Sequence, residues 1–239
     1  MRGNDSCYSV QPIGHVKSPF KTKFGLPRQS GIITSENAMI LMEPRYSSRE
    51  AFRALEKFSH IWLTFIFHQS LAGGWKNTVR PPRLGGNQKV GVFASRSPYR
   101  PNHIGQSVVE LHDVFVGTQT ELHISCPDLV DNTPIIDIKP YVHYSDSIPN
   151  ANSGFAKLEP ESKLSVIFLD VAETQLNSFL ATLPRLRNLI IETITLDPRP
   201  AYKRDNDKKV YAIRLYDLDV HFRVDRNQAT VTQINALSN

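Results

Sequence analysis

Two arginines in a proline-stiffened loop are the residues whose types and spacing most clearly point to chemistry. The stretch SRSPYRPNHIG, residues 95–105, places Arg96, Arg100 and Asn102 between two apolar, strand-like runs. A simple connector needs only Gly, Asn or a single Pro. A rigid backbone that carries guanidinium groups instead favours a preformed site for an anion, because Arg binds carboxylate or phosphate through paired hydrogen bonds.

A second stretch, PDLVDNTPIIDIKPY (residues 127–141), places Asp128, Asp131 and Asp137 around a turn and ends in Lys139 and Tyr141. One interpretation is purely structural, since Asp-Asn tolerates left-handed backbone and Thr-Pro can restart a strand. In the other interpretation, carboxylates beside a basic loop bind the amino and hydroxyl groups of a zwitterionic ligand whose carboxylate pairs with arginine. The residues alone leave both open.

Two further places could meet a ligand. His68 and Gln69 follow the apolar run IWLTFIF, at a strand end where ligands are often bound, although a simple hydrogen-bonded histidine is the commoner case. The stretch LDPRPAYKRDNDKKVY, residues 196–211, offers Arg199 and Tyr202, which either end a helix or contact phosphate and stack on a base.

Several familiar chemistries are not indicated by the sequence. It has no GxGxxG, P-loop, GxSxG or HExxH motif, and its eight histidines are scattered without ligand spacing. The two cysteines, Cys7 and Cys126, lack CxxC spacing, which argues against a disulfide framework and a thiolate zinc site. We therefore expect no metal and no covalent nucleophile.

The charge is unevenly distributed. Residues 1–110 hold 15 Lys and Arg against 6 Asp and Glu, and the remainder holds 13 against 17. No acid lies between Glu56 and Glu110, whereas seven basic residues do. Such a one-sign segment would attract a polyanion, and we favour nucleic acid over a membrane because no basic amphipathic helix is present. With no signal-peptide run and no stretch near the ~18 apolar residues of a membrane helix, we expect a soluble, cytoplasmic protein.

The elements that must position these residues are mostly strands. The runs IWLTFIF, VGVFA, SVVELHDVFVG, TELHISC and IIDIKPYV predict strands, the first of them buried on both faces. One helix is expected over 47–58, with Ser47 as N-cap and Glu50 completing a capping box. Many strands with one helix favour a closed or nearly closed barrel, so the predicted fold class is mainly β.

A composition change rich in Ser, Pro, Asn and Gly predicts a linker near residue 145. The domains expected are a barrel over 1–145, a linker over 146–163 and a small α+β domain over 164–239. In that last domain, helical spacing precedes Pro184, which either kinks the helix or starts a second one. A half-buried strand follows over 209–224, and ATVTQI can pair with it.

These stretches together resemble the TrmO (TsaA-like) family of tRNA threonylcarbamoyladenosine methyltransferases. The similarity runs nearly end to end through PIGHVKSPF, FGLPRQSG, FSHIWLTFIFHQS, GGWKNTVRPPRLGG, VGVFASRSPYRPNHIGQSVVEL, DLVDNTPIIDIKPY and DPRPAY. The resemblance implies an S-adenosylmethionine-dependent homodimer built on a single-sheet β-barrel. Its implied substrate is the threonylcarbamoylated adenosine next to the anticodon of threonine tRNA, methylated on the exocyclic nitrogen.

The same resemblance implies the site residues. The cofactor residues would be Pro27, Arg28, Gln29, His68, Gln69, Arg96, Gln106, Asp128, Leu129, Val130 and Asp131. The substrate residues would be Arg100, Asn102, Lys139, Tyr141, Arg199 and Tyr202.

Two of the matched positions depart from the family's pattern. Asn132 stands where the family has Gly, which the turn should tolerate, and Gln106 stands where an apolar residue is usual, so a contact there would use backbone or the apolar stem.

The resemblance also explains why no catalytic triad is needed. A sulfonium donor expels a neutral thioether, so positioning can supply most of the catalysis. The nitrogen must still lose a proton, and Asp128 or Asp131 could take it, but neither is selected and the catalytic base stays unassigned.

In the loop of residues 95–105, Arg96 would face the cofactor, while Arg100 and Asn102 would meet the threonyl carboxylate or a tRNA phosphate. The alternatives are a non-catalytic RNA-binding protein on the same barrel, or a methyltransferase of a small molecule or protein.

Overall fold

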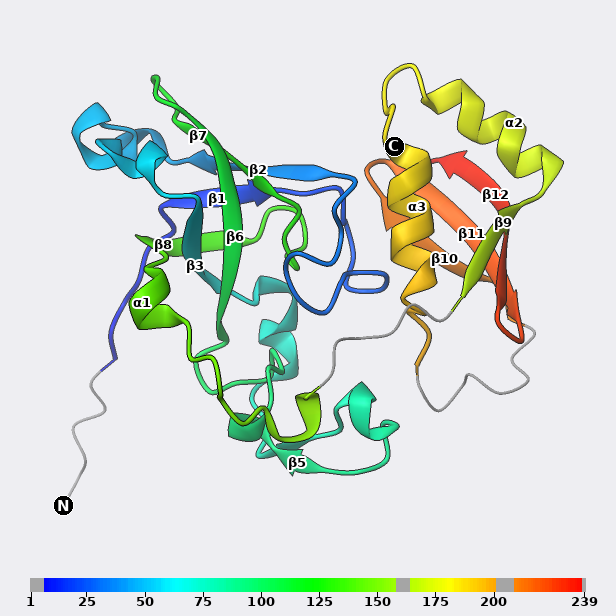
Figure 1. Cartoon of the computed structure of the whole chain (residues 1–239), viewed down its shortest axis with the longest axis horizontal. Coiled ribbons are helices and arrows are strands. Elements are labelled where there is room, and N and C mark those ends of the chain that lie inside the picture. The colour runs from blue at the N-terminus through cyan, green and yellow to red at the C-terminus, as the bar shows by residue number, and fades with distance from the viewer. Residues whose placement is uncertain (1–6, 158–163, 201–208, 238–239) are drawn as a thin grey trace.

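The chain folds into a β-barrel and a smaller α+β unit that lie side by side (Figure 1). We describe a computed structural model, which places residues 7–157, 164–200 and 209–237. Within these ranges no helix is both long and apolar enough to cross a membrane.

Six antiparallel strands close the barrel in the order β1-β2-β7-β6-β3-β8, which confirms the predicted barrel. The strands are β1 (Gly14–Lys17), β2 (Asn37–Met42), β3 (His60–Ile66), β6 (Ile104–Phe115), β7 (Glu121–Ser125) and β8 (Pro134–Pro140). Closure leaves no free sheet edge, and alternate side chains of each strand fill the interior.

The interior of the barrel explains why β3 forms where it does. Ile61, Leu63 and Phe65 are buried, whereas Trp62 and Thr64 between them are only half-buried. The expectation that this strand is buried on both faces was therefore wrong. The barrel is a single sheet, and the side chains on the outer face of β3 remain partly exposed to solvent. The inward set shares one core with Val16, Ile40, Val109, Leu122 and Ile135.

The predicted helix over 47–58 does not form. Two short 3-10 helices, η2 (Arg49–Phe52) and η3 (Leu55–Lys57), take its place, separated by Ala54 in the left-handed region at φ 69°. Ser47 does not cap a helix, because its hydroxyl donates to the carbonyl of Glu43 and accepts the backbone N–H of Thr120. This long-range pairing replaces the local capping box.

The run VGVFA is also not a strand of the barrel. Only Val90–Gly91 is extended, as β5, which pairs with β4 (Thr78–Val79) outside the barrel, and η6 (Val92–Ala94) follows at once. The remaining short helices are η1 (Pro44–Tyr46), η4 (His68–Gly73), η5 (Pro82–Leu84), α1 (His143–Asp146) and η7 (Gly154–Ala156).

The C-terminal unit is a four-stranded sheet in the order β10-β11-β12-β9 with two helices. Its elements are β9 (Ser165–Phe168), α2 (Asp170–Phe179), α3 (Leu186–Thr195), β10 (Tyr211–Leu215), β11 (Leu218–Asp225) and β12 (Gln228–Ala236). A second helix does start after Pro184, and β12 pairs with β11 as expected. The strand expected over 209–224 is instead a hairpin that turns at Tyr216, where φ is 52°. The proposed domain boundaries stay a prediction.

The strand directions sort the loops between the two ends of the barrel. Because neighbouring strands are antiparallel, β1, β3 and β7 end where β2, β6 and β8 begin. Three loops therefore meet at this end, which we call the mouth: residues 18–36, 67–103 and 126–133. The loops 43–59 and 116–120 lie at the opposite end.

Candidate functional site

The mouth of the barrel gathers nearly all of the predicted cofactor residues. Pro27, Arg28 and Gln29 lie on the first loop, His68, Gln69 and Arg96 on the second, and Asp128 to Asp131 on the third. These residues are up to about a hundred positions apart in the chain, and only closure of the barrel brings their loops together.

Asp128 is the most unusual acid of the mouth. Its carboxylate accepts a hydrogen bond of 2.6 Å from the hydroxyl of Ser107, a buried residue of β6. Burial raises the pKa of Asp128, and the hydrogen bond from Ser107 and the nearby charge of Arg96 only partly oppose that rise. A half-buried carboxylate with one hydroxyl partner is well suited to a cationic ligand group, which would restore the stability of its charged form.

Ser107 was missed at the sequence level. The signal was present in β6, where Gly105, Ser107 and Val109 alternate into the barrel and the serine is the polar member of that inward set. The same alternation places Gln106 on the outer face, exposed and 3.4 Å from the hydroxyl of Thr64. The side chain of Gln106 therefore points away from Asp128.

Asp131 is engaged by its own fold. It is 8% exposed, its carboxylate accepts the backbone N–H of Ser18 at 3.0 Å, and its second oxygen pairs with the ammonium of Lys21 at 2.8 Å. The backbone N–H of Asp131 in turn donates to the carbonyl of Phe20. The carboxylate thus ties the third loop to the first, which is the structural interpretation of this turn.

The turn also accommodates its departure from the family pattern. Asn132 adopts φ 59°, in the left-handed region that Asn tolerates, as expected. Leu129 and Val130, which precede Asp131, are buried, and Leu129 belongs to the barrel core. The carbonyl of Val130 accepts both the backbone N–H and the hydroxyl of Thr133, which closes the turn.

His68 and Gln69 begin η4, directly beside the first loop. The ammonium of Lys23 donates to the carbonyl of Gln69 at 2.8 Å, and the side chain of Gln69 reaches the carbonyl of Lys21 at 3.5 Å. Partial burial lowers the pKa of His68, and the neighbouring His15 and Lys23 lower it further. The imidazole of His68 is therefore held neutral beside a lysine-rich edge.

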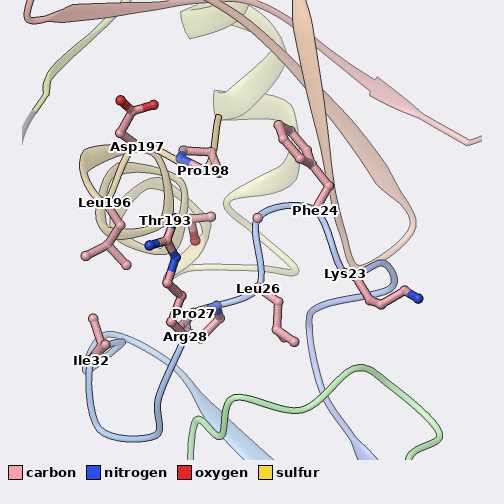
Figure 2. A pocket seen from close by; sticks show the side chains of 11 residues that line it. Lys23, Phe24, Leu26, Pro27, Arg28, Ile32, Thr193, Leu196, Asp197 and Pro198 are labelled. Carbon is pink, nitrogen blue, oxygen red and sulfur yellow. The ribbon is translucent and has the colours of Figure 1, made fainter. Parts of the chain in front are cut away.

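Pro27 and Arg28 line a pocket of about 200 Å³ between the first loop and the end of α3. Its other walls come from Lys23, Phe24, Gly25, Leu26, Ile32, Thr193, Leu196, Asp197 and Pro198. Figure 2 shows the side chain of Arg28 extending from the loop toward Thr193 and Leu196. The predicted site thus borders the C-terminal domain.

Arg100 serves its own loop. One of its guanidinium nitrogens donates to the carbonyl of Ser95 at 2.9 Å and lies 3.4 Å from that of Val92, while the group sits 5.8 Å from the ring of Phe93. Asn102 in the same loop is exposed. Arg96 is also exposed and lies near Asp128, whereas the guanidinium of Arg100 binds carbonyls of its own loop; the roles expected for the two arginines stay a prediction.

The remaining substrate residues do not gather at the mouth. Lys139 lies five residues along β8 from Pro134, roughly 17 Å away, with its ammonium 5.9 Å from the ring of Trp62. The ring of Tyr141 packs against the same Trp62 in a tilted arrangement. Arg199 is buried and pairs with Asp197 at 2.8 Å rather than projecting into solvent. Tyr202 lies outside the described residues.

The donor groups suit an organic ligand better than a metal. Among residues 7–157, 164–200 and 209–237, no cluster of three or more His, Cys, Asp or Glu is placed to hold an ion. The mouth instead combines the half-buried acid Asp128 with the cations Lys23, Arg28 and Arg96. That combination fits a zwitterion of the amino-acid type.

Comparisons with known proteins show which family the chain resembles over its two domains. Residues 15–147 match the tRNA-methyltransferase O N-terminal domain, and residues 161–237 match the TrmO C-terminal domain. The chain is 43% identical over 221 residues to the tRNA (adenine(37)-N6)-methyltransferase of Escherichia coli K12, covering 92% of this chain and 94% of that protein. It is 41% identical over 220 residues to a putative S-adenosylmethionine-dependent methyltransferase, RcsF, of Pseudomonas aeruginosa, with the same coverage.

Solved structures are similar over the whole length. A crystal structure of TrmO from P. aeruginosa superposes with a TM-score of 0.81 at 34% identity, covering 98% of this chain and 100% of that one. A second structure, described as TrmO, gives a TM-score of 0.80 at 35% identity, with 97% and 100% coverage. Both domains and their order are therefore shared.

Proposed function

The chain belongs to the TrmO family and is an S-adenosylmethionine-dependent tRNA methyltransferase acting on N6 of adenine 37, and we propose that the adenine it methylates carries a threonylcarbamoyl group. The observation that carries the proposal is the meeting of three loops at the mouth, where the half-buried Asp128 accepts the hydroxyl of Ser107 and lies near Arg96. We propose that threonine tRNA is among its tRNA substrates.

The cofactor site we propose uses opposite charges for the two ends of the amino-acid moiety. Asp128 would accept its ammonium group, and Arg96 would bind its carboxylate as a two-point partner. The buried turn at Leu129 and Val130 can offer only backbone groups, which favours contacts with a flat base over contacts with a charged end. Asp131 would act indirectly, because its carboxylate is already bound by Ser18 and Lys21.

S-adenosylmethionine supplies a methyl group that is bound to a sulfonium. Transfer of that methyl group leaves a neutral thioether, so no general acid is needed to protonate the leaving group. The task of the protein is then to hold the nucleophilic nitrogen in line and to exclude water, which is the proximity contribution to catalysis. His68, whose pKa is lowered, would be neutral at pH 7 and able to hold a proton at a ring nitrogen. No residue is assigned as the base.

The tRNA would approach over the acid-free segment between Glu56 and Glu110, part of which forms the second loop of the mouth. We also propose a homodimer in the cytoplasm, where tRNA is found. Exposed apolar side chains of the mouth loop, such as Leu71, Trp75 and Phe93, are candidates for contact with RNA or with a second copy.

The test pairs cofactor binding with product analysis. Titration calorimetry should detect S-adenosylmethionine binding, and threonine tRNA carrying the threonylcarbamoyl group should gain one methyl group at adenosine 37 in nucleoside mass spectrometry. The same tRNA without the group is the control. Methylation of both forms at equal rates would reject the modified-base proposal, and RNA binding without any cofactor binding would favour the non-catalytic alternative.

A further inference from the structure

The first loop of the mouth leaves the barrel and packs into the C-terminal domain (Figure 1). Ile33 is 1% exposed within the hydrophobic core of that domain, and Phe24 and Leu26 pack against the same core. The ring of Phe24 stacks on Tyr211 of β10 with centroids 5.8 Å apart. The apolar side chains of this loop are thus buried by the second domain rather than by the barrel.

Glycine is required at the start of this packed segment. Gly25 has φ +90°, and a Cβ there would lie 2.8 Å from a methyl carbon of Ile213. The loop therefore approaches β10 more closely than any other residue type would allow. This contact anchors the chain two residues before Pro27.

A single carboxylate anchors the other end of the segment. One oxygen of Glu192, on α3, accepts the backbone N–H of Thr34 at 3.0 Å and the backbone N–H and hydroxyl of Ser35 at 3.1 and 2.8 Å. Its other oxygen accepts the hydroxyl of Thr34 at 3.0 Å. Four hydrogen bonds to one ionised group make this the densest polar contact between the loop and the domain.

We propose that Glu192 is a positioning residue that holds the Pro27–Gln29 stretch in its cofactor-binding conformation. Residues 26–33 run between the contact of Gly25 with Ile213 and the contact of Thr34 with Glu192, and both partners belong to the C-terminal domain. Fixing both ends lowers the conformational entropy that the loop would otherwise lose when a ligand binds. The inference rests on the proposed function, since it assumes that Pro27–Gln29 contact the cofactor.

The two domains also contact each other at places that do not involve Glu192. The backbone N–H of Tyr216 donates to the carbonyl of Pro19 at 2.7 Å, and Phe20 forms a β-bridge with Leu215. The N–H of Lys21 also donates to the carbonyl of Arg214. These contacts lie before the loop segment in question, so loss of Glu192 should loosen the loop and leave the domain contact in place.

The experiment compares E192A and E192Q with a control, E173A. Glu173 pairs with Arg187 between α2 and α3 of the same domain, so E173A also removes a hydrogen-bonded carboxylate, but one that lies away from the loop. For each variant we would measure the dissociation constant of S-adenosylmethionine by calorimetry, the affinity for unmodified tRNA, the melting temperature and hydrogen exchange at Thr34 and Ser35.

E192A should speed exchange at both amides and raise the cofactor dissociation constant about tenfold, the scale expected for lost hydrogen bonds to a charged group. E192Q should fall between E192A and the parent, because an amide oxygen can still accept both backbone N–H groups. E173A should match the parent in amide exchange and in cofactor affinity. The tRNA affinity of the three variants should stay within about twofold of the parent's, well under the tenfold change that corresponds to 1.4 kcal/mol.

Three results would count against the proposals in different ways. Failure of the parent protein to bind S-adenosylmethionine would refute the proposed function itself. Tight binding by E192A despite faster exchange at Thr34 and Ser35 would refute the positioning role alone. A parallel loss of melting temperature, cofactor affinity and tRNA affinity in E192A would show that Glu192 supports the domain as a whole, which also overturns the inference.

Discussion

The hydroxyl of Ser107 donates to the carboxylate of Asp128 across 2.6 Å, at the point where β6 enters the barrel from its mouth. Ser107 belongs to a strand and Asp128 to a loop, and the partial burial of Asp128 raises its pKa. The protonation of Asp128 is therefore coupled to Ser107, and the first predictions concern this pair.

We expect D128N to bind S-adenosylmethionine at least about tenfold more weakly than the parent while melting at a similar temperature. Asparagine keeps an oxygen that accepts the Ser107 hydroxyl, but it has no negative charge for the cofactor's ammonium group. Calorimetry and thermal melting on the same preparation provide the measurement. Unchanged affinity would remove Asp128 from the cofactor site.

The same variant should alter how stability depends on pH. Because the folded-state pKa of Asp128 is raised, the folded protein binds the extra proton between the ordinary aspartate pKa and the raised one. Its contribution to stability therefore falls as pH rises through that window and is absent in D128N. Urea unfolding at a series of pH values should show the parent losing stability relative to D128N as pH increases; a constant difference would contradict burial of the charge.

S107A should weaken cofactor binding without touching the cofactor directly. Removing the hydroxyl takes away the hydrogen bond that favours the charged form, so the pKa of Asp128 should rise further. The effect on cofactor affinity should then shrink at higher pH, where Asp128 ionises regardless. A loss that is equal at all pH values would indicate a packing effect of Ser107 instead.

D131A should chiefly destabilise the fold, by about 1 to 3 kcal/mol, because it leaves the buried N–H of Ser18 without its acceptor and Lys21 without its partner. D131N is the matched control, since its amide oxygen can still accept the Ser18 N–H. Denaturant titration of both variants measures the free energy of unfolding, which should be lower for D131A than for D131N. If D131A were as stable as the parent but had lost cofactor binding, Asp131 would be a direct ligand after all.

For Arg100, the structure changes the expectation drawn from the sequence. Because its guanidinium binds carbonyls of its own loop, R100A should disorder residues 92–103 and lower turnover on tRNA with and without the threonylcarbamoyl group alike. R100K should retain more activity, since an ammonium can donate to the same carbonyls. Hydrogen exchange across the loop, with turnover on both tRNAs, is the measurement. A loss confined to the modified tRNA would restore the role in reading the substrate's carboxylate.

Arg80 and Arg49 offer a matched test of the path of the tRNA. Both are exposed, but Arg80 lies on a loop of the mouth and Arg49 at the opposite end of the barrel. R80A should reduce the salt slope of tRNA affinity by up to about one unit, and R49A should leave it unchanged. Filter binding between low and moderate salt measures both. The reverse result would place the tRNA at the other end.

The sequence by itself determined the class of fold and the family. Runs of β-branched and aromatic residues predict β3, β6 and β8, and alternation of apolar and polar residues predicts β11, because a strand that is buried on one face repeats every two residues. The motif order was enough to indicate the methyltransferase family, the cofactor and the two-part organisation. These properties are local, so they can be read along the chain.

The tertiary structure decided which residues meet. Ser47 was expected to cap a helix, but its hydroxyl binds Thr120, 73 positions away, and Glu192 reaches Thr34 over 158 positions. Likewise, Lys139 belongs to a strand that starts at the mouth but carries it to the far end, and Arg199 turns inward to Asp197. Hydrogen bonds between distant segments depend on how the barrel closes and how the second domain packs, and neither is encoded in the spacing of neighbouring residues.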